Sequence, residues 1–164
     1  LPSKALPLVV QELRVSKKLG MMSLVVEGIV VLAAILNALE TPHDCYDLLE
    51  ASMPNIHLVG NDDLTAQAYY HFAISCWKLI STSGLVYRNK KLINQFLRFL
   101  NLAIDGFKKM LNLVLLVKCF ELERDMANGE GLSDLEDHAV GSLTKLKTRI
   151  REEANYGFVG ESLN

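Results

Sequence analysis

Apolar residues recur every three or four positions along most of this chain, which is the spacing of one face of an α-helix. Turn-forming and helix-capping residues separate the resulting segments. We expect helices at residues 4–18, 21–39, 42–52, 64–80, 90–110, 111–127 and 134–153. Ser3 and Thr41 are suited to cap the first and the third of these helices. Pro54 and Gly129 are expected to end the third and the sixth.

One motif within these helices is specific to a repeat architecture. Between Asn101 and Met110, Ala103 lies one helical turn before Phe107 on an apolar stripe. A small residue lets a second helix approach closely, and the aromatic ring fills the volume beside it. This is the signature of the second helix of a tetratricopeptide repeat. The small-to-large spacing recurs in weaker form at Ala5/Val9, Cys45/Leu49 and Ala139/Leu143, and we expect these pairs, with Ala33 and Ala73, to pack neighbouring helices together.

Short connections between successive helices force antiparallel pairs. The sequence therefore predicts an all-α fold, a tetratricopeptide-like right-handed superhelix of helical hairpins with about seven helices. We expect the second helix of a truncated repeat at 1–19, hairpin repeats at 20–60, 61–111 and 112–153, and a C-terminal tail without helical periodicity at 154–164. The repeat at 61–111 contains a longer polar connection at residues 81–89.

The composition favours a protein that is covered by other proteins. Half of the 164 residues are apolar, only 22% are charged, and the first three residues resemble a connection inside a repeat of a longer polypeptide. Either the helical core is well buried, or one end or face of the array is covered by a partner, and the second interpretation is preferred. A net charge of −2 offers no broad attraction to nucleic acid or to an anionic membrane. The longest apolar run, residues 24–39, is shorter than the about 20 residues of a membrane span, so we expect a buried helix there.

The polar residues form no recognisable reaction centre, so we expect no catalytic residue, no cofactor and no metal site. The four histidines, His43, His57, His71 and His138, are far apart and show no paired metal-ligand spacing. Three cysteines stand singly in apolar helical segments, at positions 45, 76 and 119. That arrangement argues against disulfides and zinc and favours a reducing compartment. No glycine loop with a following lysine is present to bind phosphate.

Aromatic residues concentrate in the predicted helix at 64–80. Tyr69 and Tyr70 are adjacent, so they cannot both lie on the same buried stripe of a helix. We therefore consider Tyr69, Tyr70 and Trp77 candidates to face a groove or a partner on the inner surface of the array. The alternative is that most of these rings belong to the core.

The order of several motifs resembles the C-terminal tetratricopeptide region of the anaphase-promoting complex subunit 5 family. Residues 3–13 followed by 16–18, the apolar helix at 24–39, Thr41-Pro42 and the stretch 46–49 occur in the order found in that family. Residues 100–109 are similar to its penultimate repeat. Cys45 stands where the family has alanine, and residues 81–89 differ in composition.

This resemblance implies a non-catalytic scaffold subunit of a multisubunit cullin–RING ubiquitin ligase that controls mitotic progression. Its partners would be the platform subunit and neighbouring tetratricopeptide subunits, in the nucleus and cytoplasm. Two alternatives remain open. A peptide-binding adaptor would need a basic clamp for a carboxylate, and Lys78 is the only basic residue of the helix at 64–80. An all-helical enzyme would need a cluster of chemically reactive residues, which the sequence does not reveal.

Overall fold

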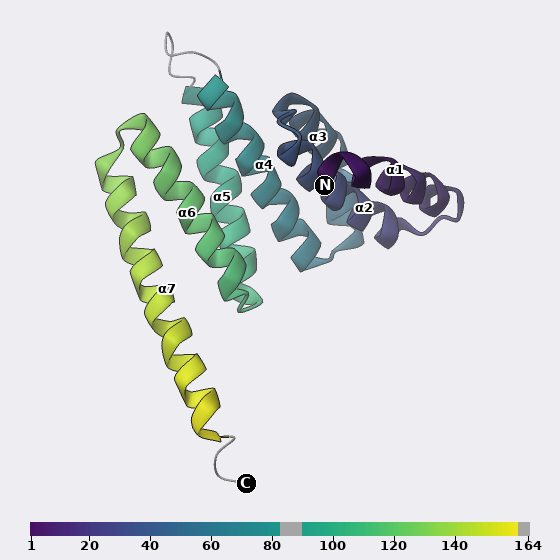
Figure 1. The fold of residues 1–164 in the computed structure, drawn as a ribbon. Helices are drawn as coiled ribbons and strands as arrows, with labels where there is room; N and C mark the ends of the chain where they lie inside the picture. Colours follow the sequence, from purple (N-terminus) through teal and green to yellow (C-terminus); the bar gives the residue numbers. More distant parts are fainter. Residues whose placement is uncertain (83–89, 161–164) are drawn as a thin grey trace. The chain divides into compact units, whose positions relative to one another are not determined.

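The structure is a computed structural model that describes residues 1–82 and 90–160, with side chains up to residue 154. Within these ranges the chain forms seven α-helices and no strand, as the sequence predicts (Figure 1). The helices are α1 (Pro2–Lys18), α2 (Met22–Ala38), α3 (Pro42–Val59), α4 (Asp62–Thr82), α5 (Lys90–Lys109), α6 (Leu113–Glu130) and α7 (Ser133–Gly160).

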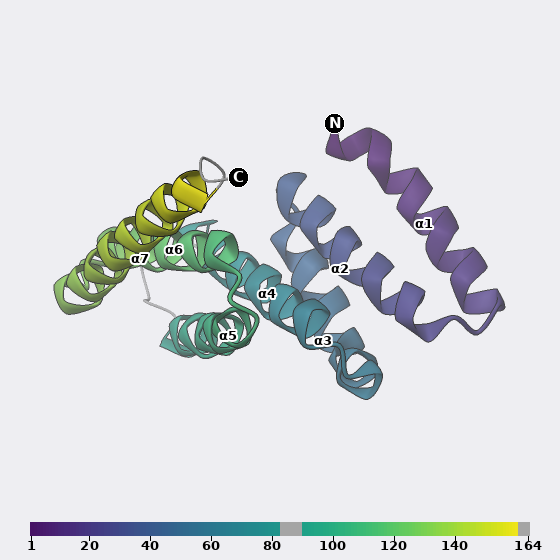
Figure 2. The ribbon, with the colours of Figure 1, turned by 90° about the horizontal axis from the view of Figure 1, so that it is seen from below.

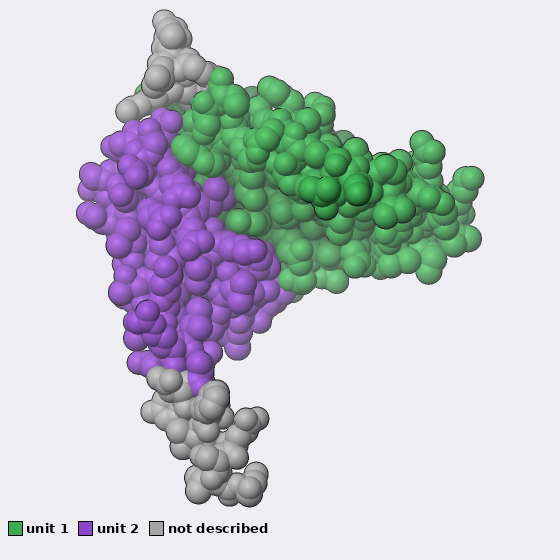
Figure 3. Space-filling model, viewed as in Figure 1, with its two compact units in different colours: residues 1–106 green, residues 107–164 purple. Residues whose placement is uncertain are grey.

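The chain is divided into two compact units (Figure 3). Unit 1, Leu1–Gly106, contains α1 to α4 and most of α5, whereas unit 2, Phe107–Asn164, contains the last residues of α5 with α6 and α7. In unit 1 α1 packs on α2, α2 on α3 and α3 on α4, and α2 also packs on α4. Figure 2 shows α1 alongside α2 at the edge of this unit. Helix α1 packs on α2, while Leu8, Val15 and Leu19, on and just after α1, are exposed.

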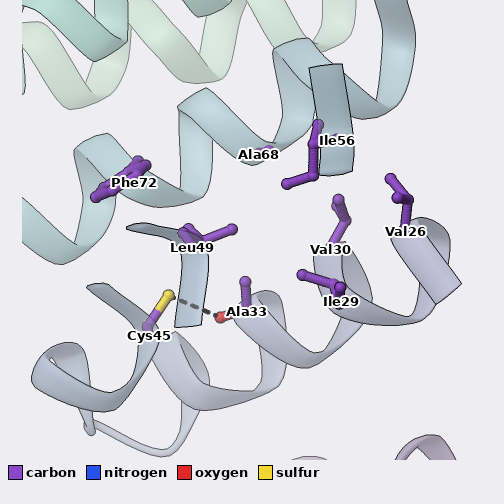
Figure 4. Packing of buried hydrophobic residues seen from close by; sticks show 9 residues of the cluster. All are labelled: Val26, Ile29, Val30, Ala33, Cys45, Leu49, Ile56, Ala68 and Phe72. Atoms are coloured by element: carbon purple, nitrogen blue, oxygen red, sulfur yellow. Dashed lines mark hydrogen bonds between the residues drawn. The ribbon is translucent and has the colours of Figure 1, made fainter. Parts of the chain in front are cut away.

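The core of unit 1 is built where small residues let α2, α3 and α4 approach one another (Figure 4). It consists of Val26, Ile29, Val30 and Ala33 from α2, Cys45, Leu49 and Ile56 from α3, and Ala68 and Phe72 from α4. The Sγ atom of Cys45 donates a hydrogen bond to the backbone oxygen of Ala33 over 3.4 Å. A cysteine at this small-residue position therefore both permits close packing and ties α3 to α2.

The residues predicted to pack the repeats lie inside. Val9, Ala33, Cys45, Leu49, Ala73, Ala103, Phe107, Ala139 and Leu143 are buried, and Ala5 is half-buried. Ala103 and Phe107 lie one turn apart on α5 and are both fully buried. In unit 2, α6 and α7 pack as a hairpin, and Ala139 and Leu143 of α7 are buried.

A close approach between α4 and α5 occurs at Gly106, which the sequence motif did not single out. A Cβ atom built on Gly106 would lie 2.6 Å from the Cβ atom of Ala66. Real Cβ atoms do not approach one another that closely, and the methyl group of Ala66 is fixed to its backbone. Gly106 is therefore required for the spacing of these two helices.

Several predicted helix ends are wrong. The third helix does not stop before Pro54 but continues to Val59, because Ile56 is fully buried in the core and Gly60 ends the helix with φ of 67°. The sixth helix begins at Leu113, capped by the side chain of Asn112, which accepts from the Leu115 amide over 3.1 Å. It continues through Gly129 to Glu130, and Gly131 ends it with φ of 67°.

The predicted tail and the predicted polar connection also differ from the structure. Helix α7 extends to Gly160, so most of the tail at 154–164 is helical. Charged pairs one turn apart, such as Arg149 and Glu153 at 2.9 Å, support a helix whose residues 147–149 and 151–154 are exposed. Ser81 and Thr82 belong to α4, whereas residues 83–89 and 161–164 lie outside the described residues.

The Gly106–Ala66 contact gives a direct test of the packing. Replacing Gly106 by alanine should lower the free energy of unfolding by about 1–2 kcal/mol. Overpacking costs about 1–3 kcal/mol, and this cost outweighs the higher helix propensity of alanine. Urea unfolding followed by circular dichroism measures the change.

Two further variants make this test specific. Gly141→Ala is the control, since a Cβ atom there has nothing within 4 Å, and it should stabilise the chain by up to about 1 kcal/mol. Adding Ala66→Gly to Gly106→Ala should restore much of the lost stability, because it removes the opposing methyl group. If Gly106→Ala is as stabilising as Gly141→Ala, the close contact of α4 with α5 is wrong.

Candidate functional site

Helices α3, α4 and α5 surround a hollow of about 320 Å³ on unit 1, which we call the aromatic hollow. Helix α4 provides its floor with Tyr69 and Phe72. Residues one to two turns apart on α3 form one wall, namely Tyr46, Glu50, Met53 and His57. The other wall is the corresponding face of α5, namely Gln95, Arg98, Phe99 and Leu102. Three consecutive helices therefore place their side chains around one concave site.

Stacked rings join the floor of the aromatic hollow to its α5 wall. The rings of Phe72 and Phe99 are stacked with their centres 4.1 Å apart, and the ring of Tyr69 stacks on Phe99 at 6.0 Å. The edge of the Tyr46 ring meets Phe72 at 4.9 Å. Aromatic pairs in these arrangements contribute about 0.5–1.5 kcal/mol beyond the area that they bury. The hollow is therefore preformed.

Two hydrogen bonds fix the polar groups of the hollow. The Nε2 atom of His57 lies 2.9 Å from the hydroxyl of Tyr69, and the side-chain amide of Gln95 donates to the hydroxyl of Tyr46 over 2.9 Å. Burial raises the pKa of the Tyr46 hydroxyl and that of Tyr69, so both stay protonated at neutral pH. The bond between Tyr46 and Gln95 bridges α3 and α5.

A second hollow of about 550 Å³ adjoins the first, and Tyr46 and Gln95 line both. It is lined by Asp47 on α3 and Lys91 on α5, among other residues. In this second hollow the acidic side chain is therefore on the α3 wall and the basic one on the α5 wall. The aromatic hollow has the same arrangement, with Glu50 on α3 and Arg98 on α5. These four side chains belong to exposed residues, and none forms an ion pair with another residue in the described part of the chain.

The structure separates the three aromatic residues that the sequence proposed as partner-facing. Tyr69 lines the aromatic hollow. Tyr70 and Trp77 are half-buried and line neither hollow, and the ring of Tyr70 lies 5.5 Å from that of His71. Sequence reasoning missed His57 because the third helix was expected to end before it. It also missed Arg98, for which only the amphipathic pattern of α5 was available as a signal.

Lys78 has a structural role. Its Nζ atom donates to the backbone oxygen of Asn37 at the end of α2 and lies 2.7 Å from a carboxylate oxygen of Glu40. Glu40 has φ of 59°, in the left-handed region, so the ion pair helps to hold an unfavourable turn. The lysine thus stabilises the last carbonyls of a helix, where a positive charge is favourable. The one basic residue that a carboxylate clamp on α4 would need is already paired.

A buried polar network continues from Lys78 between α2 and α4. The side-chain amide of Asn37 donates to the backbone oxygen of His71 over 3.0 Å, and the hydroxyl of Ser75 lies 3.2 Å from the amide oxygen of Asn37. Asn37 and Ser75 are both buried. Buried polar groups of this kind fix the register of two helices when they are satisfied.

Among the residues of unit 2 whose side chains are described, one acidic residue is buried, Glu123 on α6. Its Oε2 atom has no hydrogen-bond partner within the described residues, and Nδ1 of His138 on α7 lies 3.5 Å away, which is long for a hydrogen bond. Burial raises the pKa of Glu123 from its ordinary value of 4.5, while the neighbouring His138 and then Lys108 lower it. The net effect of this environment is to favour the protonated carboxyl.

The cysteines are placed for packing. All three are fully buried, and burial raises the pKa of Cys76 and of Cys119 to about 12 and that of Cys45 above its ordinary value. Thiols with raised pKa values are poor nucleophiles at neutral pH. Where the structure describes the chain, no group of three histidine, cysteine or acidic residues could hold a metal ion. None of the helices described is both long enough and apolar enough to span a bilayer.

Glu123 predicts a pH dependence of stability. Its pKa is higher in the folded than in the unfolded chain, so protonation stabilises the folded state. This stabilisation is complete below the unfolded pKa and is lost as the pH rises through the folded pKa. Glu123→Gln should therefore be more stable than wild type at neutral pH, and the advantage should vanish as the pH falls to about 4.5.

Urea unfolding of both proteins between pH 4 and pH 8 or so measures this difference. Glu152→Gln is the control, because Glu152 is exposed and its replacement should shift stability little at any pH. A Glu123→Gln variant that is less stable than wild type at neutral pH would mean that the pair with His138 outweighs the cost of burial.

No protein-family model matches the chain, and neither does any curated protein or solved structure. The resemblance to the anaphase-promoting complex subunit 5 family therefore rests on the motifs themselves, chiefly residues 5–7 in order with Thr41 and Pro42, and it stays a prediction.

Proposed function

We propose that this chain is a non-catalytic scaffold, which acts by burying apolar helix faces against neighbouring proteins. The observation that carries this proposal is the open face of α1. Six of the twelve exposed large apolar residues in the described part of the chain lie within the first 22 residues. On and just after α1, Leu8, Val15 and Leu19 are 68%, 50% and 67% exposed.

These residues form a stripe, which we call the α1 stripe. Leu8 and Val15 are seven positions apart and Leu19 follows four positions later, so their side chains share one side of the helix. The other side of α1 is already used, because Val9 is buried and Leu13 packs against Gly28 of α2. A helix that is apolar on two sides is typical of one packed between neighbours.

The energetics favour a protein partner for this stripe. Burying a side chain such as Leu8 fully contributes about 1.5–3 kcal/mol, and three such residues offset a substantial part of the cost of association. The spacing of the α1 stripe suits packing by another helix.

The specific assembly that we propose is the anaphase-promoting complex. Its support is the motif order that resembles subunit 5 of that complex, together with an all-α fold of the expected kind. In this proposal the platform subunit or a neighbouring tetratricopeptide subunit supplies the helix that covers the α1 stripe. The chain would then contribute position and affinity to a ubiquitin ligase, without a reaction of its own.

The buried reactive side chains are compatible with this role. The cysteines pack the core, Lys78 holds the end of α2, and Asn37 fixes α2 to α4. The same pairing of Lys78 counts against the alternative, an adaptor that clamps a carboxylate with a basic residue of α4.

The test is to make the α1 stripe polar and measure assembly. The double variant Leu8→Glu/Val15→Glu should lose binding to co-expressed platform and tetratricopeptide subunits by at least about tenfold, because two charges would have to be buried at the interface. Its circular dichroism spectrum and unfolding midpoint should stay close to wild type, since both residues are exposed in the free chain. Co-purification and biolayer interferometry measure the binding.

Arg14→Glu is the matched control, because it makes the same change in net charge, and Arg14 is exposed on α1 about 120° around the helix from Leu8. It should bind as wild type does. If the double variant assembles as well as the control, the α1 stripe is not the docking surface, and the proposed role loses its main support.

A further inference from the structure

We infer that the groove between α3 and α5 is a second docking surface, and that it receives an amphipathic helix carrying acidic residues along one flank and basic residues along the other. The groove consists of the aromatic hollow and the adjoining hollow, with the bridge between Tyr46 and Gln95 between them. This surface is different from the α1 stripe. The inference goes beyond the proposed function, because it specifies the chemistry of a partner for another face of unit 1.

The two hollows are successive parts of one groove. Its α3 wall includes residues 43, 46, 50, 53 and 57, which follow one face of that helix for almost four turns. Its α5 wall includes residues 91, 95, 98 and 102, which follow one face for about three turns, or about 16 Å at 1.5 Å per residue. A helical segment of about eleven residues has the same length.

A helix suits this groove better than an extended peptide. The walls and floor are helices whose backbone groups are bonded internally, so they offer no edge to which a strand could add. A bound strand would leave its own amides without partners beside the stacked rings of the floor. A bound helix satisfies its own backbone and needs only side-chain contacts. Because the hydrogen bond between Tyr46 and Gln95 separates the two hollows, a bound helix could place one apolar side chain in each of them.

Apolar contacts would supply the affinity. Met53 and Leu102 stand on opposite walls of the aromatic hollow, and Leu102 is 37% exposed. The half-buried rings of Tyr69 and Phe99 offer a flat surface below them. An aliphatic side chain inserted here would contact both walls and the floor, as the anchor residues of other helix-in-groove complexes do.

The charges of the walls define the flanks of the partner. Asp47 and Glu50 on α3 would attract basic residues on one flank of the partner helix. Lys91 and Arg98 on α5 would attract acidic residues on its other flank. Lys91 and Arg98 are seven residues apart, so acidic residues at the same spacing on a helix lying along α5 would meet both. Because the four charged side chains have no ion-pair partner in the described part of the chain, such contacts would replace no existing ion pair.

The test uses the full chain and three synthetic 18-residue peptides, each labelled with fluorescein and stapled on its outward face so that all are equally helical. They share leucines at positions i, i+3, i+7 and i+10. One peptide has glutamates on one flank and lysines on the other, the second has only glutamates, and the third only lysines. Fluorescence anisotropy should show the mixed peptide binding about five to ten times more tightly than either single-sign peptide, with the preference reduced by salt.

Protein variants assign the binding to the groove. Glu50→Lys makes both walls of the aromatic hollow basic, so the preference should move from the mixed peptide to the all-glutamate peptide. Leu102→Glu should weaken the binding of all three peptides at least about tenfold. It should not unfold the chain, since Leu102 is partly exposed. Glu27→Lys is the control, because Glu27 is exposed on α2 and lines neither hollow, and it should leave the preferences unchanged.

Three results would overturn the inference. The first is a lack of saturable binding by any peptide, and the second is a preference that Glu50→Lys does not move. The third is concentration-dependent dimerisation of the free chain that Leu102→Glu abolishes, which would assign the groove to a second copy. The variant Leu8→Glu/Val15→Glu keeps the two proposals apart. It should bind the mixed peptide normally, and a loss there would mean that the peptides occupy the α1 stripe.

Discussion

The close approach of helices at small side chains is the constraint on which the rest of this structure depends. Ala33 and Cys45 bring α2 and α3 together, and Gly106 lets α5 approach Ala66 of α4. Without these contacts the walls of the groove would separate, and the bond between Tyr46 and Gln95 could not bridge them. The same arrangement leaves α1 with one packed face and one open face. Packing inside the unit thus determines which surfaces remain for partners.

Much of the fold could be predicted because helical packing leaves a local signature. Ala103 and Phe107 lie one turn apart in the sequence, and both are fully buried. Helix ends were harder to predict from the sequence. Pro54 would normally stop a helix, but here the burial of Ile56 in the core keeps the helix going beyond it. The contact of Gly106 with Ala66 joins residues forty positions apart, and no pattern within one helix reveals it.

The candidate site was less accessible to sequence reasoning for the same reason. Tyr69 stood out as one of two adjacent tyrosines, but its partners His57 and Phe99 come from other helices. Trp77 is of a residue type common at interfaces and yet lines neither hollow. In the sequence Lys78 is only the single basic residue of the predicted helix at 64–80, because its partners Asn37 and Glu40 lie outside that helix. A site formed by side chains from three different helices cannot be predicted from the pattern within any one of them.

The central claim of the proposed function is that neighbouring proteins cover apolar faces of this chain. Hydrogen exchange measured by mass spectrometry on the free chain and on the chain within assembled anaphase-promoting complex tests it most directly. We expect the amides of α1 to exchange more slowly in the assembly by about tenfold or more, because a docked helix suppresses local opening. Equal exchange of α1 in the two states, with the chain shown to be incorporated, would contradict the account.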